Sequence, residues 1–161
     1  MKYFLTVILA NFVILGAVPV QAESIWNKNL PNMAATVPMT VYRSPSCGCC
    51  GIWLEHMKKH NFEINDVKTN DVQSIKQKYG IKGELASCHT ALVGGYLVEG
   101  HVPAEDIHTL LKEQPKILGL SVPGMPHGTP GMEMSGQRHP FSVISFDKNG
   151  EQKVFRDYSF Y

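Results

Sequence analysis

Three cysteines occur within four residues, Cys47-Gly48-Cys49-Cys50, and a fourth, Cys88, stands far along the chain. Structural disulfides are the usual reason for an even number of cysteines in an exported protein. Neighbouring cysteines, however, close loops too short to constrain the unfolded chain much. Thiolate sulfur is also the preferred ligand of soft metal ions such as Cu(I). The spacing therefore favours a site where sulfur is gathered to bind metal.

The motif allows two overlapping chemistries. Cys47 and Cys50 have the CxxC spacing of a thiol-disulfide oxidoreductase, in which Cys47 attacks and Cys50 resolves. Cys49 lies between them and would scramble such disulfides, whereas each added thiolate strengthens a soft-metal site. One tetrahedral ion would strain to take three ligands from four consecutive residues, so we expect several Cu(I) ions that share thiolates. A structural zinc site of four cysteines is a third alternative, but zinc ligands normally come as two separated pairs.

A second group of soft ligands lies near the C-terminal end. Residues 124–134 contain three methionines and one histidine among glycines and prolines. Thioether and imidazole suit copper better than the hard cations, and the thioether needs no deprotonation. We expect Met125, His127 and Met132 to act as ligands or as a lid, ahead of Met134. The alternative is that these methionines fill a hydrophobic patch.

The remaining histidines carry weaker signals. His101 follows an expected hairpin and could approach the cysteines, where with His127 it would stabilise Cu(II). His56 and His60 have i, i+4 spacing on an expected helix but lie away from its cysteine end, so we expect them on the solvated surface. His108 is likewise expected at the surface, and the sequence assigns no role to His89 or His139.

The N-terminus resembles a secretory signal. Lys2 is followed by an almost uninterrupted apolar run, and small residues precede a cleavage site after Ala22. A retained membrane anchor is the alternative, although the run is short for a span. Without Lys2 the basic count falls from 15 to 14, equal to the 14 acidic residues. A neutral chain argues against nucleic acid as a partner, and we expect no membrane insertion after cleavage.

The elements that would position these groups follow from periodicity. Residues 39–42 and 62–67 are expected strands, with a helix carrying Ile52 and Trp53 between them. A second helix follows an N-cap at Asn70-Asp71, and Gly94-Gly95 joins two strands as a hairpin. Pro103 opens a third helix. Aromatic side chains are expected in the core, namely Trp53, Tyr96, Phe141 and Phe155.

This order predicts an α/β fold with a thioredoxin-like domain. Residues 119–139 are expected to form an added loop rich in Met, His, Gly and Pro, and residues 141–158 a C-terminal β-hairpin. We divide the chain into a signal peptide (1–22), an N-terminal arm (23–37) and the thioredoxin-like copper-binding domain (38–161).

Cys88 has a defined place in this plan. In thioredoxin-like folds the residue entering the third strand lies against the Cys motif, where a cis-proline normally stands. This sequence has Cys88-His89 there and no proline, which would bring a fourth sulfur to the site. Two alternatives stay open, in which Cys88 is a buried apolar residue or forms a disulfide with a motif cysteine.

Four ordered motifs carry a resemblance to a known family: Cys47-Gly48-Cys49-Cys50-Gly51, Ser87-Cys88-His89-Thr90, Gly100-His101-Val102-Pro103, and Val122-Pro123-Gly124-Met125-Pro126 through Gly131-Met132-Glu133. The chain resembles the CopG-type periplasmic copper-resistance proteins from about Met39 onward. The resemblance implies a periplasmic thioredoxin-like domain, a part in copper tolerance, and copper binding by Cys47, Cys49, Cys50 and Cys88 beside the Met125/His127/Met132 loop.

The biochemical step is left open by both the residues and the resemblance. The protein could sequester copper, hand it to other periplasmic copper-resistance or efflux proteins, or interconvert Cu(I) and Cu(II). The last of these would make it an enzyme with copper redox activity.

Overall fold

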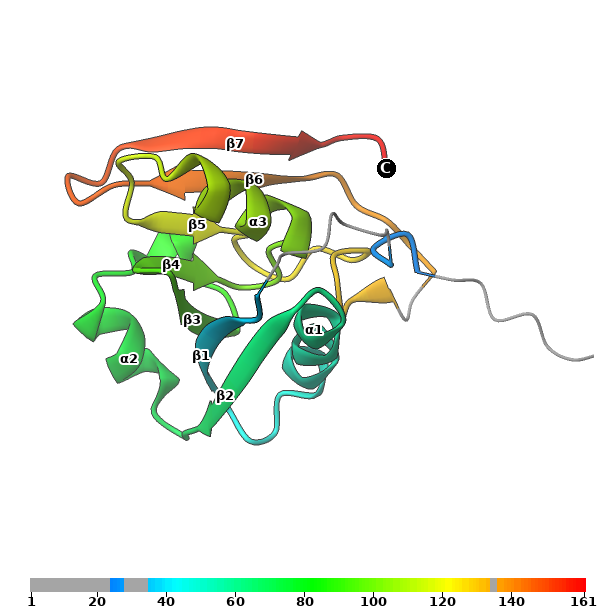
Figure 1. Cartoon of the computed structure of the whole chain (residues 1–161), viewed down its shortest axis with the longest axis horizontal. Coiled ribbons are helices and arrows are strands. Elements are labelled where there is room, and N and C mark those ends of the chain that lie inside the picture. Colours follow the sequence, from blue (N-terminus) through cyan, green and yellow to red (C-terminus); the bar gives the residue numbers. More distant parts are fainter. Residues whose placement is uncertain (1–23, 28–34, 134–135) are drawn as a thin grey trace, which may run out of the picture.

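The fold is a mixed α/β arrangement in one seven-stranded sheet, seen in a computed structural model that describes residues 24–27, 35–133 and 136–161 (Figure 1). The strand order is β2-β1-β3-β4-β5-β6-β7. The strands are β1 (Val37–Arg43), β2 (Phe62–Lys68), β3 (His89–Val93), β4 (Tyr96–Glu99), β5 (Gly119–Ser121), β6 (Phe141–Phe146) and β7 (Gln152–Tyr158). The helices are α1 (Gly48–Lys59), α2 (Val72–Lys78), α3 (Ala104–Glu113) and the short 3-10 helix η1 (Gly83–Leu85).

The first four strands follow the expected order. β1 and β2 are parallel and joined through α1, because parallel strands need a crossover connection, which is usually a helix. β3 runs antiparallel to β1, and β4 pairs with β3 through the Gly94-Gly95 turn. Both glycines have positive φ (54° and 86°), as a two-residue hairpin turn requires. The sequence prediction of a βαβ unit followed by a hairpin and a helix is therefore confirmed.

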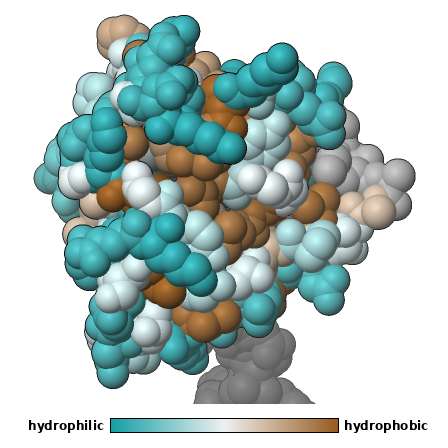
Figure 2. All heavy atoms as spheres, turned by 90° about the vertical axis from the view of Figure 1, so that its left-hand side faces the viewer, coloured by the Kyte–Doolittle hydropathy of each residue, from teal (hydrophilic) through white to brown (hydrophobic). Residues whose placement is uncertain are grey.

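The helices cover the two faces of the sheet unequally. Neighbouring residues of β4 show this, because Val98 packs in the larger core with α1 and α3, while Leu97 packs in a smaller cluster with Ile81 and Leu85. Apolar side chains are visible in the middle of the face on the α2 side (Figure 2). Of the expected core aromatics, Trp53 and Phe141 are buried, and Tyr96 and Phe155 are partly buried.

The expected loop over residues 119–139 begins instead as a strand. Residues Gly119–Ser121 form β5, which runs parallel to β4 and antiparallel to β6. The C-terminal hairpin of β6 and β7 thereby continues the same sheet rather than standing apart. Gly119 allows the close pairing, since a Cβ there would lie 2.1 Å from the Leu97 carbonyl oxygen. Three residues were too few for a periodic signal in the sequence.

The described part of the N-terminal arm is anchored by one aromatic residue. Trp26 is buried among the rings of Phe141, Tyr158 and Tyr161, and its indole N–H donates to the Gly128 carbonyl at 2.8 Å. Residues 24–27 therefore pack on the C-terminal hairpin and on the loop after β5. The expected signal segment, residues 1–22, lies outside the described residues. Within the described ranges, no helix is long and apolar enough to cross a membrane.

Candidate metal centre

The cysteine motif forms the start of α1. Cys47 is the N-cap residue, and its sulfur accepts the backbone N–H of Cys50 at 3.4 Å. Cys50 is fully buried, whereas Cys47 and Cys49 are half-buried. The unpaired N–H groups and positive dipole end of a helix favour a negatively charged sulfur at this position. The first turn of α1 carries no acidic residue that would oppose it.

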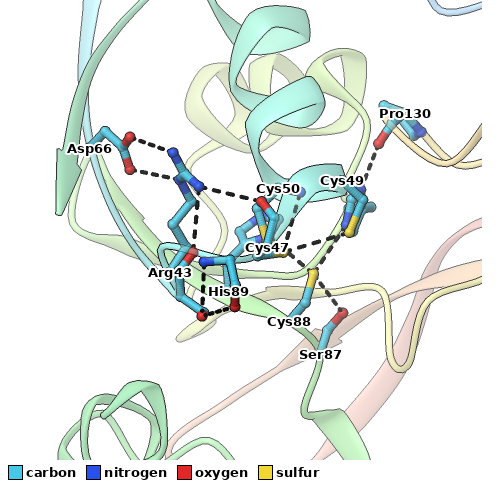
Figure 3. The surroundings of a disulfide bond; sticks show 12 residues. Arg43, Cys47, Cys49, Cys50, Asp66, Ser87, Cys88, His89 and Pro130 are labelled. Carbon is cyan, nitrogen blue, oxygen red and sulfur yellow. Dashed lines mark hydrogen bonds and ion pairs between the residues drawn. A yellow bond between two sulfur atoms is a disulfide. The ribbon is translucent and has the colours of Figure 1, made fainter. Parts of the chain in front are cut away.

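Cys47 and Cys50 are joined by a disulfide, and Cys49 and Cys88 are free thiols (Figure 3). The Cys49 sulfur lies 3.6 Å from that of Cys47. All four sulfur atoms lie within 4.8 Å of one another. The long connection from α1 to β3 thus returns Cys88 to the motif, as the sequence predicted. The bonded pair is the one that the oxidoreductase alternative requires.

Cys88 faces two histidines as well as the other sulfurs. Its sulfur lies 3.1 Å from His101 Nε2 and 3.3 Å from His89 Nδ1. These three residues form a second group whose ligand atoms lie within 4.8 Å of one another. Burial, and next the neighbouring Cys49, raises the pKa of the Cys88 thiol to about 12. A cation that binds this sulfur must therefore displace its proton.

The two histidines offer neutral nitrogen atoms to the site. A carbonyl oxygen can only accept, so the contact of 2.7 Å between His101 Nδ1 and the Pro130 oxygen places a proton on Nδ1. This leaves the lone pair of Nε2 directed at Cys88. Both rings are buried, and burial lowers the pKa of His101 and, more strongly, of His89. Neutral imidazole is the form that binds metal ions.

The methionine and histidine loop reaches this centre through its backbone. Gly131 packs against α1, where a Cβ would lie 2.9 Å from the Cys49 oxygen and from the Trp53 nitrogen. Its φ of +85° also favours glycine. The Glu133 carboxylate accepts the Gly131 N–H at 2.7 Å, which holds the Pro130 carbonyl next to His101. The loop is thus packed against the edge of the sulfur cluster.

The side chains expected as ligands in this loop are more dispersed. Met125 exposes 53% of its surface, and Met132 and His127 are half-buried. The rings of His127 and His139 lie 5.0 Å apart. In the described part of the chain, the groups of Cys, His, Asp and Glu close enough to share an ion do not include His127. A ligand role for Met125, His127 and Met132 therefore stays a prediction, and Met134 lies outside the described residues.

His56 and His60 are buried, so the prediction of a solvated surface was wrong. The Ala104 backbone N–H donates to His56 Nε2 at 3.3 Å, and His60 Nδ1 donates to the His56 carbonyl at 2.7 Å. His108 is half-buried rather than exposed, and its Nε2 donates to the His60 carbonyl at 2.9 Å. The helical spacing alone did not show that α3 packs over the end of α1.

The sequence assigned no role to His89, and it gave His101 an approach to the cysteines and a part in stabilising Cu(II), although it carried a sharper signal for the position of His101. A two-residue turn at Gly94-Gly95 pairs Thr90 with Glu99. Continuing that register by two residues places Cys88 opposite His101. For His89 the signal was its position next to Cys88 in the segment expected to face the motif. Its contact with Trp53 of α1, with ring centroids 4.3 Å apart, could not be read from the sequence.

Two comparisons with known proteins found relatives. Residues 85–132 match the family described as "Protein of unknown function, DUF411". Two solved structures of a "Copper resistance protein copG", designated forms 2 and 1, are each 36% identical to this chain with a TM-score of 0.73. The match covers 76% of this chain and 98% of form 2, and 78% of this chain and 99% of form 1. This chain belongs to the CopG family. No curated protein sequence matches it.

CopG membership confirms the resemblance carried by the four sequence motifs. The DUF411 match spans Cys88, His89, His101 and the loop to Met132, but not the cysteine motif. The CopG structures match a larger share of the chain, 76% and 78%.

Proposed function

We propose that this protein binds copper as Cu(I) on Cys47, Cys49, Cys50 and Cys88 and takes part in copper resistance. The observation that carries the proposal is the meeting of four sulfur atoms within 4.8 Å at the N-terminal end of α1. Thiolate sulfur selects Cu(I) over the hard cations. Membership of the CopG family, whose solved members are titled copper resistance proteins, supports copper as the metal.

Several copper ions fit this cluster better than one. Three of the sulfurs come from four consecutive residues, so they bridge ions more readily than they surround a single tetrahedral ion. The Cys47–Cys50 disulfide must first be reduced by an external dithiol, which is itself oxidised to a disulfide, because only thiolates bind the metal. His101 and His89 then extend the ligand set, and the neighbouring loop contributes Met125, His127 and Met132.

The site is suited to two oxidation states of copper. Sulfur favours Cu(I), whereas the imidazoles of His101 and His89 also accept Cu(II). Two Cu(II) ions can each take one electron from the Cys47 and Cys50 thiols, which forms the disulfide and releases two protons. Such a step would reduce Cu(II) to Cu(I) before the ion is handed to another copper-resistance or efflux protein.

We further propose that the protein works in the periplasm after cleavage behind Ala22. The mature chain then consists of an arm (23–37) and a thioredoxin-like domain (38–161) that binds copper. The β2-β1-β3-β4 order, with a cysteine motif where β1 enters α1, supports this assignment. β5, the loop and the β6–β7 hairpin are additions to that domain.

A thiol-disulfide oxidoreductase is the second candidate function. It is favoured by the disulfide that joins the CxxC pair at the N-terminus of α1. In that role the Cys47 thiolate would attack a substrate disulfide, and Cys50 would release the product by forming the Cys47–Cys50 bond. Cys49, only 3.6 Å from the Cys47 sulfur, would compete with Cys50 for the same intermediate.

The Cys49→Ser variant separates the two functions. Reduced protein is loaded with Cu(I) without oxygen, and the bound copper is counted by elemental analysis. The wild-type chain should hold several Cu(I) ions, and the variant should lose most of them while keeping its fold. The same samples are assayed for insulin reduction with Cys50→Ser as the control for an oxidoreductase.

Full copper stoichiometry in Cys49→Ser would contradict the cluster. Insulin reduction that survives Cys49→Ser and is abolished by Cys50→Ser would favour the oxidoreductase. A sample that prefers Zn(II) to Cu(I) in competition would favour the zinc alternative.

A further inference from the structure

A buried ion pair lies directly behind the segment that carries Cys88. Glu99 of β4 is fully buried, and Lys76 of α2 is 5% exposed and forms an ion pair with its carboxylate. Glu99 Oε2 accepts the Thr90 hydroxyl at 2.6 Å, and Lys76 Nζ donates to the same hydroxyl oxygen at 3.2 Å. Every polar atom of the pair thus has a partner from the same small group. Neither residue belongs to the proposed ligand set.

The Glu99 carboxylate holds both flanks of Cys88. Its Oε1 accepts the backbone N–H of Ser87 at 2.6 Å, one residue before Cys88, and its Oε2 holds Thr90, two residues after it. Gly100, which follows Glu99 in the chain, donates its N–H to the His89 carbonyl at 3.0 Å. A single side chain therefore fixes the position of the Cys88 backbone relative to β4 and to His101.

The segment has few other constraints. Cys88 precedes the first residue of β3 and follows η1, so it lies outside the regular ladder of the sheet. Ser87 is joined to Gly124 by an isolated bridge and by a side-chain hydrogen bond to the Gly124 carbonyl. Gly100 leaves room for this turn, since a Cβ there would lie 2.5 Å from Ser87 Cβ. The charged acceptor is the strongest of these contacts.

Global stability alone does not explain a buried ion pair here. Removing two charges from water costs free energy that their attraction often only offsets, and well-packed apolar residues can be as stable. What an ion pair with directed hydrogen bonds supplies is one geometry of the groups that it holds. Groups behind metal ligands commonly affect metal affinity by about 10–100-fold through such positioning.

We propose that Glu99, paired with Lys76, is the positioning residue that holds the Cys88 sulfur against the three sulfurs of the cysteine motif. Without the carboxylate, the Ser87 N–H and the Thr90 hydroxyl lose their acceptor and the Cys88 segment shifts away from the motif. The inference concerns sulfur geometry, and it rests on the proposed function only where copper is the readout.

The test that needs no metal measures how fast Cys49 and Cys88 form a disulfide. In a Cys47→Ser/Cys50→Ser chain only these two thiols remain, and diamide oxidises them to a cross-link that mass spectrometry counts over time. Adding Glu99→Gln replaces one of the two acceptor oxygens by an NH2 donor and removes the charge, so it should slow the cross-link several-fold. Asp106→Asn is the matched control. Asp106 of α3 is also fully buried, and its carboxylate is held by Arg156 and by the Tyr158 hydroxyl, both of β7.

An unchanged cross-linking rate in Glu99→Gln, or an equal loss in Asp106→Asn, would overturn the proposal. If Glu99→Gln does not fold, Thr90→Val replaces it, since this change removes one hydroxyl at constant shape and should slow the cross-link less strongly but measurably. A Thr90→Val chain that is folded and reacts like the parent would also overturn it.

Copper supplies a second readout in the chain with all four cysteines. Competition with a Cu(I) chelator should show Glu99→Gln weaker than wild type by about 10–100-fold, and no further loss when it is combined with Cys88→Ser. If the losses of Cu(I) affinity in Glu99→Gln and Cys88→Ser add in the double variant, Glu99 does not act through Cys88 and the proposal is overturned. If the wild-type chain binds no Cu(I), the proposed function fails, and the cross-linking rates decide this inference alone.

Discussion

Two groups of buried histidines flank α1, and they differ in where their nitrogen lone pairs point. At the N-terminal end, His101 Nε2 and His89 Nδ1 face the Cys88 sulfur. At the C-terminal end, His56 Nε2 instead accepts the first N–H of α3, whose N-cap Pro103 has no side chain to do so. Residue type and burial are alike in the two groups. The atom that the ring nitrogens face, a thiol sulfur or a backbone group, distinguishes a candidate metal centre from a structural contact.

Removing a lone pair at the N-terminal group should have the largest effect on metal binding. His101→Ala deletes the nitrogen nearest to Cys88, so we expect copper affinity to fall by about 100-fold, equivalent to about 2.7 kcal/mol. Competition with a chelator of known affinity measures this loss. A His101→Ala chain that binds copper like wild type would remove the distinction between the two groups.

At the C-terminal end of α1 we expect a loss of stability without a loss of copper binding. His56→Gln removes the acceptor for the Ala104 N–H and the packing of the ring, which should lower the free energy of unfolding by about 2 kcal/mol. Copper stoichiometry should not change. Urea unfolding measures the first quantity and metal analysis the second. Loss of copper without loss of stability would contradict the structural assignment.

The C-terminal group also predicts how stability depends on pH. Burial, and next the neighbouring His60, lowers the pKa of His56 to about 3. The unfolded chain takes up a proton below the ordinary pKa of about 6.5, but the folded chain does not. The contribution of His56 is therefore complete above pH 6.5 and is lost as the pH falls toward 3, at about 1.4 kcal/mol per pH unit.

Unfolding curves at several pH values check this, with His56→Gln as the comparison. The variant should show a shallower slope between pH 6 and 4 than wild type. Identical slopes in His56→Gln and wild type would show that other groups carry the pH dependence. His89, His101 and His108, whose pKa values are also lowered by burial, act in the same direction.

The smallest expected change in stability concerns Met125. Its side chain is 53% exposed, so Met125→Leu should alter the free energy of unfolding by less than about 0.5 kcal/mol. If the thioether is a ligand, the variant nevertheless binds Cu(I) more weakly. Chelator competition on this otherwise unchanged chain therefore tests the ligand role by itself. Equal affinity would leave Met125 as a surface residue.

The sequence predicted the first part of the fold because its signals are local. Apolar periodicity located the helices, and the Gly94-Gly95 turn located the β3–β4 hairpin. β5 was missed because it has three residues and is a strand only through pairing with β4 and β6. Trp26 could not be placed, since its contacts with Tyr158 and Tyr161 span almost the whole chain.

The candidate site also has a part that local sequence signals predicted and a part that they did not. The spacing of Cys47, Cys49 and Cys50 identified the motif, and the order of the elements brought Cys88 to it. The hydrogen bond that selects the His101 tautomer depends on Pro130, which arrives from a loop with no periodic signal. The burial of His56 depends on α3 packing over α1. Contacts between elements distant in sequence set these lone pairs, and local patterns do not report them.

Copper X-ray absorption on the reduced, anaerobically loaded protein tests the central claim most directly. The account predicts that sulfur dominates the first shell and that a copper–copper contribution is present, as thiolates shared between ions require. The account also predicts that the copper–copper contribution is lost in Cys49→Ser. A first shell of nitrogen and oxygen alone, without a second copper, would contradict the four-sulfur cluster as the copper site.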